Sequence, residues 1–178
     1  MVLRKEMSKM IKKIIMVILV LATIYFIGDT NLKGMSVYYA KHSSSSNTRD
    51  LEIMMLVENI QASADHEGFR YRVRGDKTIK NTTKNVYLSY GYSVNDVNYE
   101  YAYKYEDGLG YYFDNFLKLK GIYNSKEARY YIDISTVDEN KIKEEIYENF
   151  KSILKEEEEK PFINLQWIFN WVYRDRIK

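Results

Sequence analysis

Cysteine is absent from this sequence of 178 residues, and proline and histidine are almost absent, with one and two copies. The lack of cysteine excludes a disulfide scaffold, a thiolate metal site and a cysteine nucleophile. The two histidines lie in a serine-rich stretch (His42) and at the end of a predicted helix (His66). Neither position favours a catalytic base over a solvated or helix-terminal side chain.

Sequence motifs with a known chemistry are also missing. The chain contains no H-E-x-x-H, G-x-S-x-G, Walker or EF-hand pattern, and Gly108-Leu-Gly110 is only a fragment of a glycine motif. We therefore expect no catalytic residue, no cofactor and no metal site. The composition, with 46% hydrophobic and 29% charged residues, is that of a globular protein rather than a disordered chain.

The charge of the chain is unevenly distributed. Of the formal net charge of +2, the first thirteen residues carry +4, so the remainder carries −2. A nearly neutral main part argues against recruitment of nucleic acid. The basic residues of the tail are Arg4, Lys5, Lys9, Lys12 and Lys13.

An uncharged apolar run, Ile14–Ile27, follows this basic tail. Counted from Ile11 to Gly28, it is long enough for a slightly short transmembrane helix. A cleaved signal peptide is an alternative, but no A-x-A cleavage pattern follows the run, and a buried core helix is another. The basic tail outweighs Lys33 and Lys41 beyond the run, which places the N-terminus in the cytoplasm.

The remaining domain organisation follows from composition. Residues 29–47 include turn-like dipeptides and the low-complexity stretch His42–Asn47, so we expect a serine-rich tether. The sequence thus predicts a cytoplasmic tail over 1–10, a signal-anchor over 11–28, this tether, and an extracytoplasmic domain over 48–178.

Two segments have helical periodicity. The run Leu51–Ala64 places its apolar residues on one stripe, and Gly68 suits its end. A second helix is predicted after the capping-box spacing Thr136–Glu139 and before Pro161. Its apolar stripe is Ile142, Ile146, Phe150, Ile153 and Leu154.

Strand periodicity is clearest in a hairpin. Residues 86–94 and 97–105 both alternate at period two around Asn95-Asp96, which suits a two-residue turn. The predicted register pairs Val94 with Val97 and places every apolar residue on one face. The other expected pairs are Tyr92–Tyr99, Tyr90–Tyr101, Leu88–Tyr103 and Val86–Tyr105.

Further strands are predicted over 69–74, 128–135 and 162–173, whereas 76–84 is expected to be a polar loop. The segment 111–121 is ambiguous between helix and strand. These elements predict an α+β fold: one N-terminal transmembrane helix, then an antiparallel sheet of about five strands packed by two amphipathic helices.

Seven side chains are candidates for a ligand or partner surface. The three arginines alternate along one strand, where guanidinium groups can bind phosphate or carboxylate or simply form a charged face that opposes aggregation. Two tyrosines fall on the polar face of the sheet, and two tryptophans either close the core or form an exposed patch. The candidates are Arg70, Arg72, Arg74, Tyr87, Tyr131, Trp167 and Trp171.

An anchor joined to a patterned domain without a catalytic constellation favours a non-enzymatic interaction module. We expect a subunit or accessory of a bacterial envelope or secretion-type assembly, with the membrane and other envelope proteins as partners. A module that binds an anionic envelope polymer or peptide is the alternative. A hydrolase with Glu100 and Asp133 as its carboxylate pair is a third hypothesis.

Overall fold

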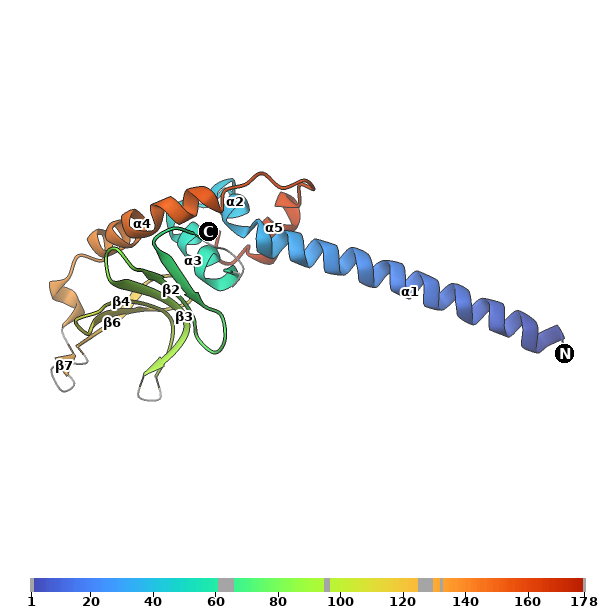
Figure 1. Ribbon diagram of the computed structural model, residues 1–178, viewed down its shortest axis with the longest axis horizontal. Helices are drawn as coiled ribbons and strands as arrows, with labels where there is room; N and C mark the ends of the chain where they lie inside the picture. Colours follow the sequence, from blue (N-terminus) through green and yellow to red (C-terminus); the bar gives the residue numbers. More distant parts are fainter. Residues whose placement is uncertain (1, 61–65, 95–96, 125–129, 132, 178) are drawn as a thin grey trace.

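The computed structural model of the chain describes residues 2–60, 66–94, 97–124, 130, 131 and 133–177. It consists of a long helix and an α+β domain (Figure 1). Helix α1 (Val2–Gly34) projects away from the domain. Its stretch Lys9–Gly34 reaches a mean hydropathy of 2.3 in a window of which no part is buried. By length and composition, this helix can cross a membrane.

The segment expected to be a tether is helical over most of its length. Helix α1 continues to Gly34, and α2 (Ser36–Lys41) follows after one residue. Tyr39 and Ala40 are fully buried. The expectation of a flexible linker from residue 29 is therefore wrong for α2, because its apolar side chains belong to the core of the domain.

The sheet is an antiparallel meander in which each strand pairs with its neighbour in sequence. Among the described residues, six strands form it, where about five were expected, and a short seventh, β7 (Tyr130–Tyr131), pairs with β6 at its edge. The six are β1 (Phe69–Arg72), β2 (Lys77–Asn81), β3 (Val86–Val94), β4 (Val97–Tyr105), β5 (Leu109–Phe113) and β6 (Leu119–Asn124).

The predicted hairpin is confirmed as β3 and β4, and all five predicted residue pairs are present, from Val94–Val97 to Val86–Tyr105. The turn residues 95 and 96 lie outside the described residues. One feature differs from the prediction: the ring of Tyr99 packs on Tyr112, at 5.1 Å between centroids, on the face opposite Tyr101. Gly91, in β3, has a φ of 75°, a left-handed conformation that interrupts the regular alternation there.

Three other strand predictions need correction. The supposed loop 76–84 contains β2, whose single apolar residue, Ile79, is fully buried. The ambiguous segment 111–121 is divided between β5 and β6. Of the strand expected over 128–135, only β7 is present among the described residues, and Ile134–Thr136 forms a 3-10 turn, η1.

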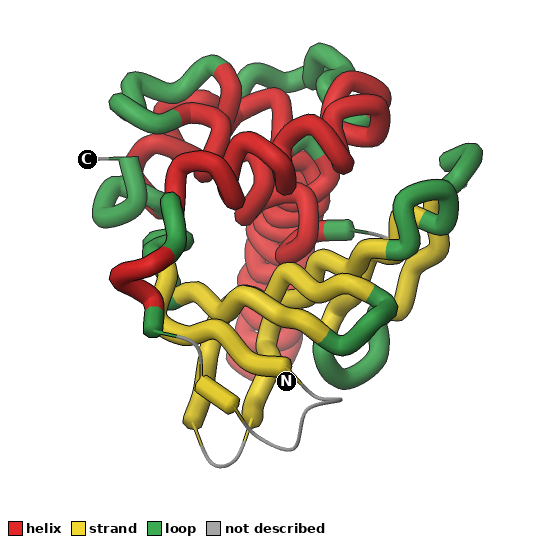
Figure 2. The backbone as a smooth tube through the Cα atoms, turned by 90° about the vertical axis from the view of Figure 1, so that its left-hand side faces the viewer, coloured by secondary structure: helices red, strands yellow, loops and turns green. Residues whose placement is uncertain are grey.

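Two long helices cover one face of the sheet (Figure 2). In α3 (Thr48–Asn59), every residue from Leu51 to Val57 is buried, because the helix packs against α2, α4 and the sheet. In α4 (Glu139–Glu156), the five residues of the predicted stripe are all buried. The N-cap of α4 is Asp138, which accepts hydrogen bonds from the backbone N–H groups of Asn140 and Lys141, and not Thr136 as the capping box predicted.

The strand predicted over 162–173 is wrong, because Gln166–Val172 forms helix α5. Residues two apart in a helix lie about 200° apart around its axis, so a period-two series divides into two opposite faces with i, i+4 spacing. Phe169 is fully buried on one face, whereas Trp167 and Trp171 are 71% and 67% exposed on the other.

Candidate functional site

The tyrosines on the covered face of the sheet belong to the core. Tyr101 and Tyr103 are fully buried, and their hydroxyl groups donate hydrogen bonds to Glu58 and Glu145. Burial and the adjacent carboxylates raise the pKa of both hydroxyls, which therefore stay protonated and serve as donors. These side chains are structural and are not available to a ligand.

The opposite face of the sheet is not covered by the helices in Figure 2 and contains a hollow of about 440 Å³. The hollow brings together side chains from β1 to β6. Its aromatic and basic lining residues are Arg72, Tyr87, Lys104, Tyr105, Tyr112 and Tyr123. Polar and aromatic groups around a shallow concavity can contact a polar ligand or an extended polypeptide.

Charges around this hollow are paired. The guanidinium of Arg72 forms an ion pair with Asp76 and donates a hydrogen bond to the hydroxyl of Thr78. Lys80 lies over the ring of Tyr87, 4.8 Å from its centroid, and 3.5 Å from a carboxylate oxygen of Glu106. The open face is therefore electrostatically mixed rather than a ridge of free cations.

Lys104 has the most perturbed charge on this face. Burial lowers the pKa of its ammonium group to about 8. The nearby Asp76 raises this pKa, and the nearby Arg72 lowers it. Its Nζ lies 6.0 Å from the centroid of the Tyr112 ring. A partly desolvated ammonium group gains more from an anionic ligand than one in bulk water does.

The structure separates the predicted site residues. Arg72 and Tyr87 line the hollow; Arg70 is exposed on β1, and Arg74 is exposed beyond the end of that strand. Tyr131 lies in β7 opposite Tyr123, and its side chain is outside the described part of the chain. Trp167 and Trp171 lie on α5, away from the hollow.

Among the lining residues that the sequence analysis missed are Lys104, Tyr112 and Tyr123. Lys104 was within reach of sequence reasoning, because the predicted hairpin register places it opposite Tyr87. Tyr112 and Tyr123 were not, because β5 and β6 lie in a segment whose periodicity was ambiguous.

The carboxylates of the hydrolase hypothesis are not lining residues of this hollow. Glu100 is exposed on β4. Asp133 accepts a hydrogen bond from the backbone N–H of Ser135 as the cap of η1, which lowers the pKa of its carboxyl. Within the described residues, no group of three or more histidine or acidic side chains could hold a metal ion.

The histidines have structural contacts. His66 is bonded through Nδ1 to the hydroxyl of Tyr71 at 2.6 Å, and its Nε2 lies 3.2 Å from Glu157. The ring of His42 stacks on Tyr38 at 4.1 Å.

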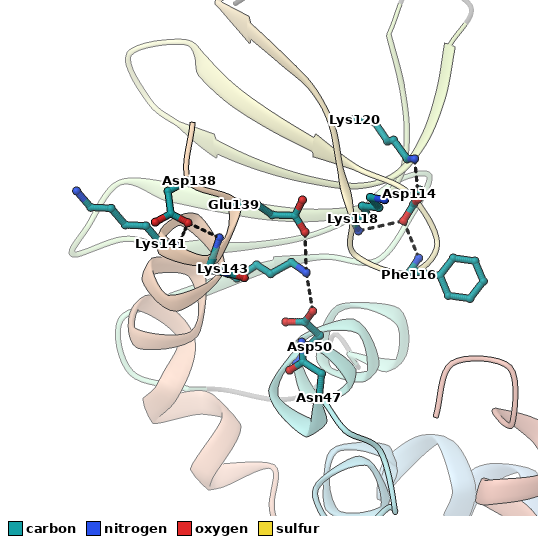
Figure 3. A network of polar contacts seen from close by, with 11 residues as sticks. Asn47, Asp50, Asp114, Phe116, Lys118, Lys120, Asp138, Glu139, Lys141 and Lys143 are labelled. Atoms are coloured by element: carbon teal, nitrogen blue, oxygen red, sulfur yellow. Dashed lines mark hydrogen bonds and ion pairs between the residues drawn. The ribbon is translucent and has the colours of Figure 1, made fainter. Parts of the chain in front are cut away.

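A second group of charges fixes the helices to each other (Figure 3). The Nζ of Lys143 on α4 lies 2.7 Å from Asp50 on α3 and 2.9 Å from Glu139. Burial alone would lower the pKa of Lys143, but its hydrogen bonds to the two carboxylates outweigh burial and raise that pKa. This largely buried bridge is structural, because it joins two helices of the covered side.

No family model, curated protein or solved structure matches this chain.

Proposed function

We propose that this chain is a membrane-anchored interaction module, without enzymatic activity, of a bacterial envelope or secretion-type assembly. Helix α1 is the anchor in this proposal, with the N-terminus in the cytoplasm and the domain outside. The eighteen residues from Ile11 to Gly28 extend about 27 Å as a helix, close to the thickness of a bilayer core of about 30 Å. The excess of basic residues before this stretch and in its first turn supports the orientation.

The observation that carries the proposal is the rigid junction between α1 and the domain. The hydroxyl of Tyr39 on α2 lies 2.7 Å from Oδ1 of Asn31 on α1 and 2.9 Å from the carbonyl oxygen of Ile163. It also accepts a hydrogen bond from the backbone N–H of Leu165 at 3.1 Å. One fully buried side chain thus connects the end of α1, α2 and the C-terminal segment.

A domain held at a fixed angle to its anchor presents a defined face to its neighbours. A module that captures soluble ligands gains little from this constraint, whereas a subunit of an assembly loses less orientational freedom when it docks. The open face of the sheet is the contact surface in this proposal, because the partly exposed Tyr87 and the charges around it are accessible to a protein partner.

Site-specific photocrosslinking in native membranes tests this proposal. A photoreactive amino acid in place of Tyr87 is expected to capture a defined envelope protein. The same probe in place of Lys141, exposed on α4 in the helical layer, is the matched control and is expected to capture none of it. Equal capture from both positions, or capture from neither, would contradict an interaction through the open face.

A ligand-binding module for an anionic polymer is a second candidate, favoured by the partly desolvated Lys104 beside Arg72. Polyphosphate is a suitable probe with the full-length protein in detergent. Binding is expected to weaken about tenfold or more in a R72Q/K104Q variant and to be unchanged in K141Q, since a hydrogen bond to a charged group contributes on the order of 1.5–3 kcal/mol. Unchanged binding in the double variant would exclude this site.

A further inference from the structure

Exposed hydrophobic side chains cluster in the C-terminal segment. Outside α1, the described residues include seven large hydrophobic side chains that are exposed, and five of them lie between residues 162 and 172. Such a concentration on a folded domain is unusual and marks a contact surface. The five are Phe162, Ile163, Trp167, Trp171 and Val172.

This segment is held firmly to the domain. The ring of Phe169 is fully buried, 5.6 Å from the ring of Tyr39 and 4.6 Å from that of Tyr173. Nε2 of Gln166 donates a hydrogen bond to the backbone oxygen of Tyr39 at 2.9 Å. The exposed side of α5 is therefore a fixed surface.

The same segment lies beside the last turns of α1. An apolar groove of about 710 Å³ is lined on one side by α1 between Ile24 and Lys33, and on the other by residues between Ile163 and Tyr173. Trp171 and Ile168 line this groove, and Trp167 precedes Trp171 by one helical turn. In Figure 1, α5 is drawn next to the end of α1 from which the domain begins.

The polar residues of α1 indicate the depth at which this contact occurs. The apolar run ends at Gly28, and Asp29 and Lys33 form an ion pair of 2.7 Å in the following turn. A span from Ile11 to Gly28 would place that ion pair among the lipid headgroups. The groove includes residues on both sides of this boundary.

We infer that α5 and its flanking residues lie in the headgroup region of the membrane that α1 crosses, with Trp167 and Trp171 inserted among the outer-leaflet lipids. This inference rests on the proposed membrane anchor. Tryptophan favours the membrane interface, because its ring is apolar and its N–H can still reach polar groups. Tyr25 and Phe26, 76% and 70% exposed on α1, form the adjacent part of the same aromatic belt.

The chain has only two tryptophans, so its intrinsic fluorescence reports on this surface directly. The full-length protein is reconstituted into vesicles of phosphatidylcholine and phosphatidylglycerol, and its integration is measured by resistance to alkaline extraction. Emission is then quenched from the lipid side by lipids brominated near the headgroup and from the water side by iodide. The variants W167F and W171F separate the two signals.

The matched control carries Ile134→Trp in the W167F/W171F background. Ile134 is 43% exposed on η1, which directly precedes α4, and Figure 1 shows the start of α4 at the end of the domain far from α1. We expect strong quenching by brominated lipid for Trp167 and Trp171, and iodide quenching weaker than in the control by about threefold or more, because interfacial tryptophan is shielded from water. The control is expected to respond to iodide and not to brominated lipid.

The outcomes distinguish the inference from the proposed function. Integration with tryptophans that iodide quenches and brominated lipid does not would overturn the inference and leave the anchor intact. Integration with tryptophans shielded from both quenchers would also overturn it, since a second copy of the chain or another protein surface would then cover α5. Complete release by alkaline extraction would overturn the anchor, and the inference with it.

Discussion

The two faces of the sheet use tyrosine in opposite ways. On the covered face, Tyr101 and Tyr103 are fully buried and bonded to carboxylates. On the open face, Tyr87 is half-buried and stacked under Lys80. The residue type is the same, and only the helical layer distinguishes a core residue from one that a partner can reach. The covered face should therefore govern stability, and the open face should govern binding.

The largest effect is expected from Tyr103→Ala. Removal of a fully buried aromatic ring should lower the free energy of unfolding by about 3–5 kcal/mol, from lost burial and from the cavity that remains. Tyr103→Phe is the matched control and should lower the free energy of unfolding by only about 2 kcal/mol, since it removes two hydrogen bonds, one to Glu145 and one from Asn149, at about 1 kcal/mol each. Denaturant unfolding of the full chain in detergent, followed by circular dichroism, measures both. A loss for Tyr103→Ala no greater than that for Tyr87→Ala would remove the distinction between the faces.

Lys143→Met sharpens the comparison within the covered side. The substitution leaves Asp50, whose side chain is only 11% exposed, without its ammonium partner. It should therefore lower the free energy of unfolding by about 2–4 kcal/mol. The D50N/K143M double variant should recover part of this loss, because the charge of Asp50 is then removed as well and only the more exposed Glu139 lacks its partner. Because the folded pKa of Lys143 is raised, its stabilisation is present below the unfolded pKa and is lost as pH rises through the folded value. Unfolding measured across this alkaline range tests the sign.

Asp114→Ala should have a smaller effect. Burial opposes the charge of this carboxylate, but hydrogen bonds from the backbone N–H groups of Lys118 and Phe116, together with Lys120, lower its pKa (Figure 3). Its stabilisation, about 1–2 kcal/mol for these hydrogen bonds, is present above the unfolded pKa and is lost as pH falls through the lowered folded value. Wild type and variant should therefore converge in acid. A difference that persists unchanged in acid would contradict this role.

The smallest effect on stability is expected from Lys104→Met on the open face, and its sign should be opposite. Burial lowers the pKa of Lys104 to about 8, so the folded state opposes its charge, and the variant should be slightly more stable at neutral pH. This gain should be full below pH 8 and should disappear as pH rises towards the unfolded lysine value of about 10.4. The free energy of unfolding of Lys104→Met, measured at pH 7 and pH 10, reports the cost of Lys104 in stability. Crosslinking from position 87 in the same variant reports the role of Lys104 in binding.

The elements that sequence predicted well have strong local patterns. The β3–β4 hairpin alternates over nine residues on each strand, and a shift of one residue would have placed its apolar set on the wrong face. Helix α4 likewise has a continuous apolar stripe, because a single face of the helix is buried. In both elements, local periodicity and tertiary burial favour the same structure.

The elements that sequence predicted poorly depend on tertiary contacts. Strand β2 buries a single apolar residue, Ile79, which gives too weak a pattern to predict a strand. The strand forms because β1 and β3 pair with it on both sides. The alternation in α5 satisfied a strand pattern, and only the burial of Phe169 against Tyr39 shows which residues face inwards. For the candidate site, Arg72 and Tyr87 were predictable from strand alternation, whereas Tyr112 and Tyr123 required the meander to be known.

The contact between Tyr39 and Leu165 has a consequence for the order of folding. Sequential strand pairing lets the sheet form progressively as the chain emerges, since each strand finds its partner a short distance away in sequence. The Tyr39 clamp, in contrast, joins residues 126 positions apart and can close only after the C-terminal segment has been synthesised. The angle between the domain and α1 is thus set last, so an incomplete chain can have a folded sheet and still lack a fixed orientation.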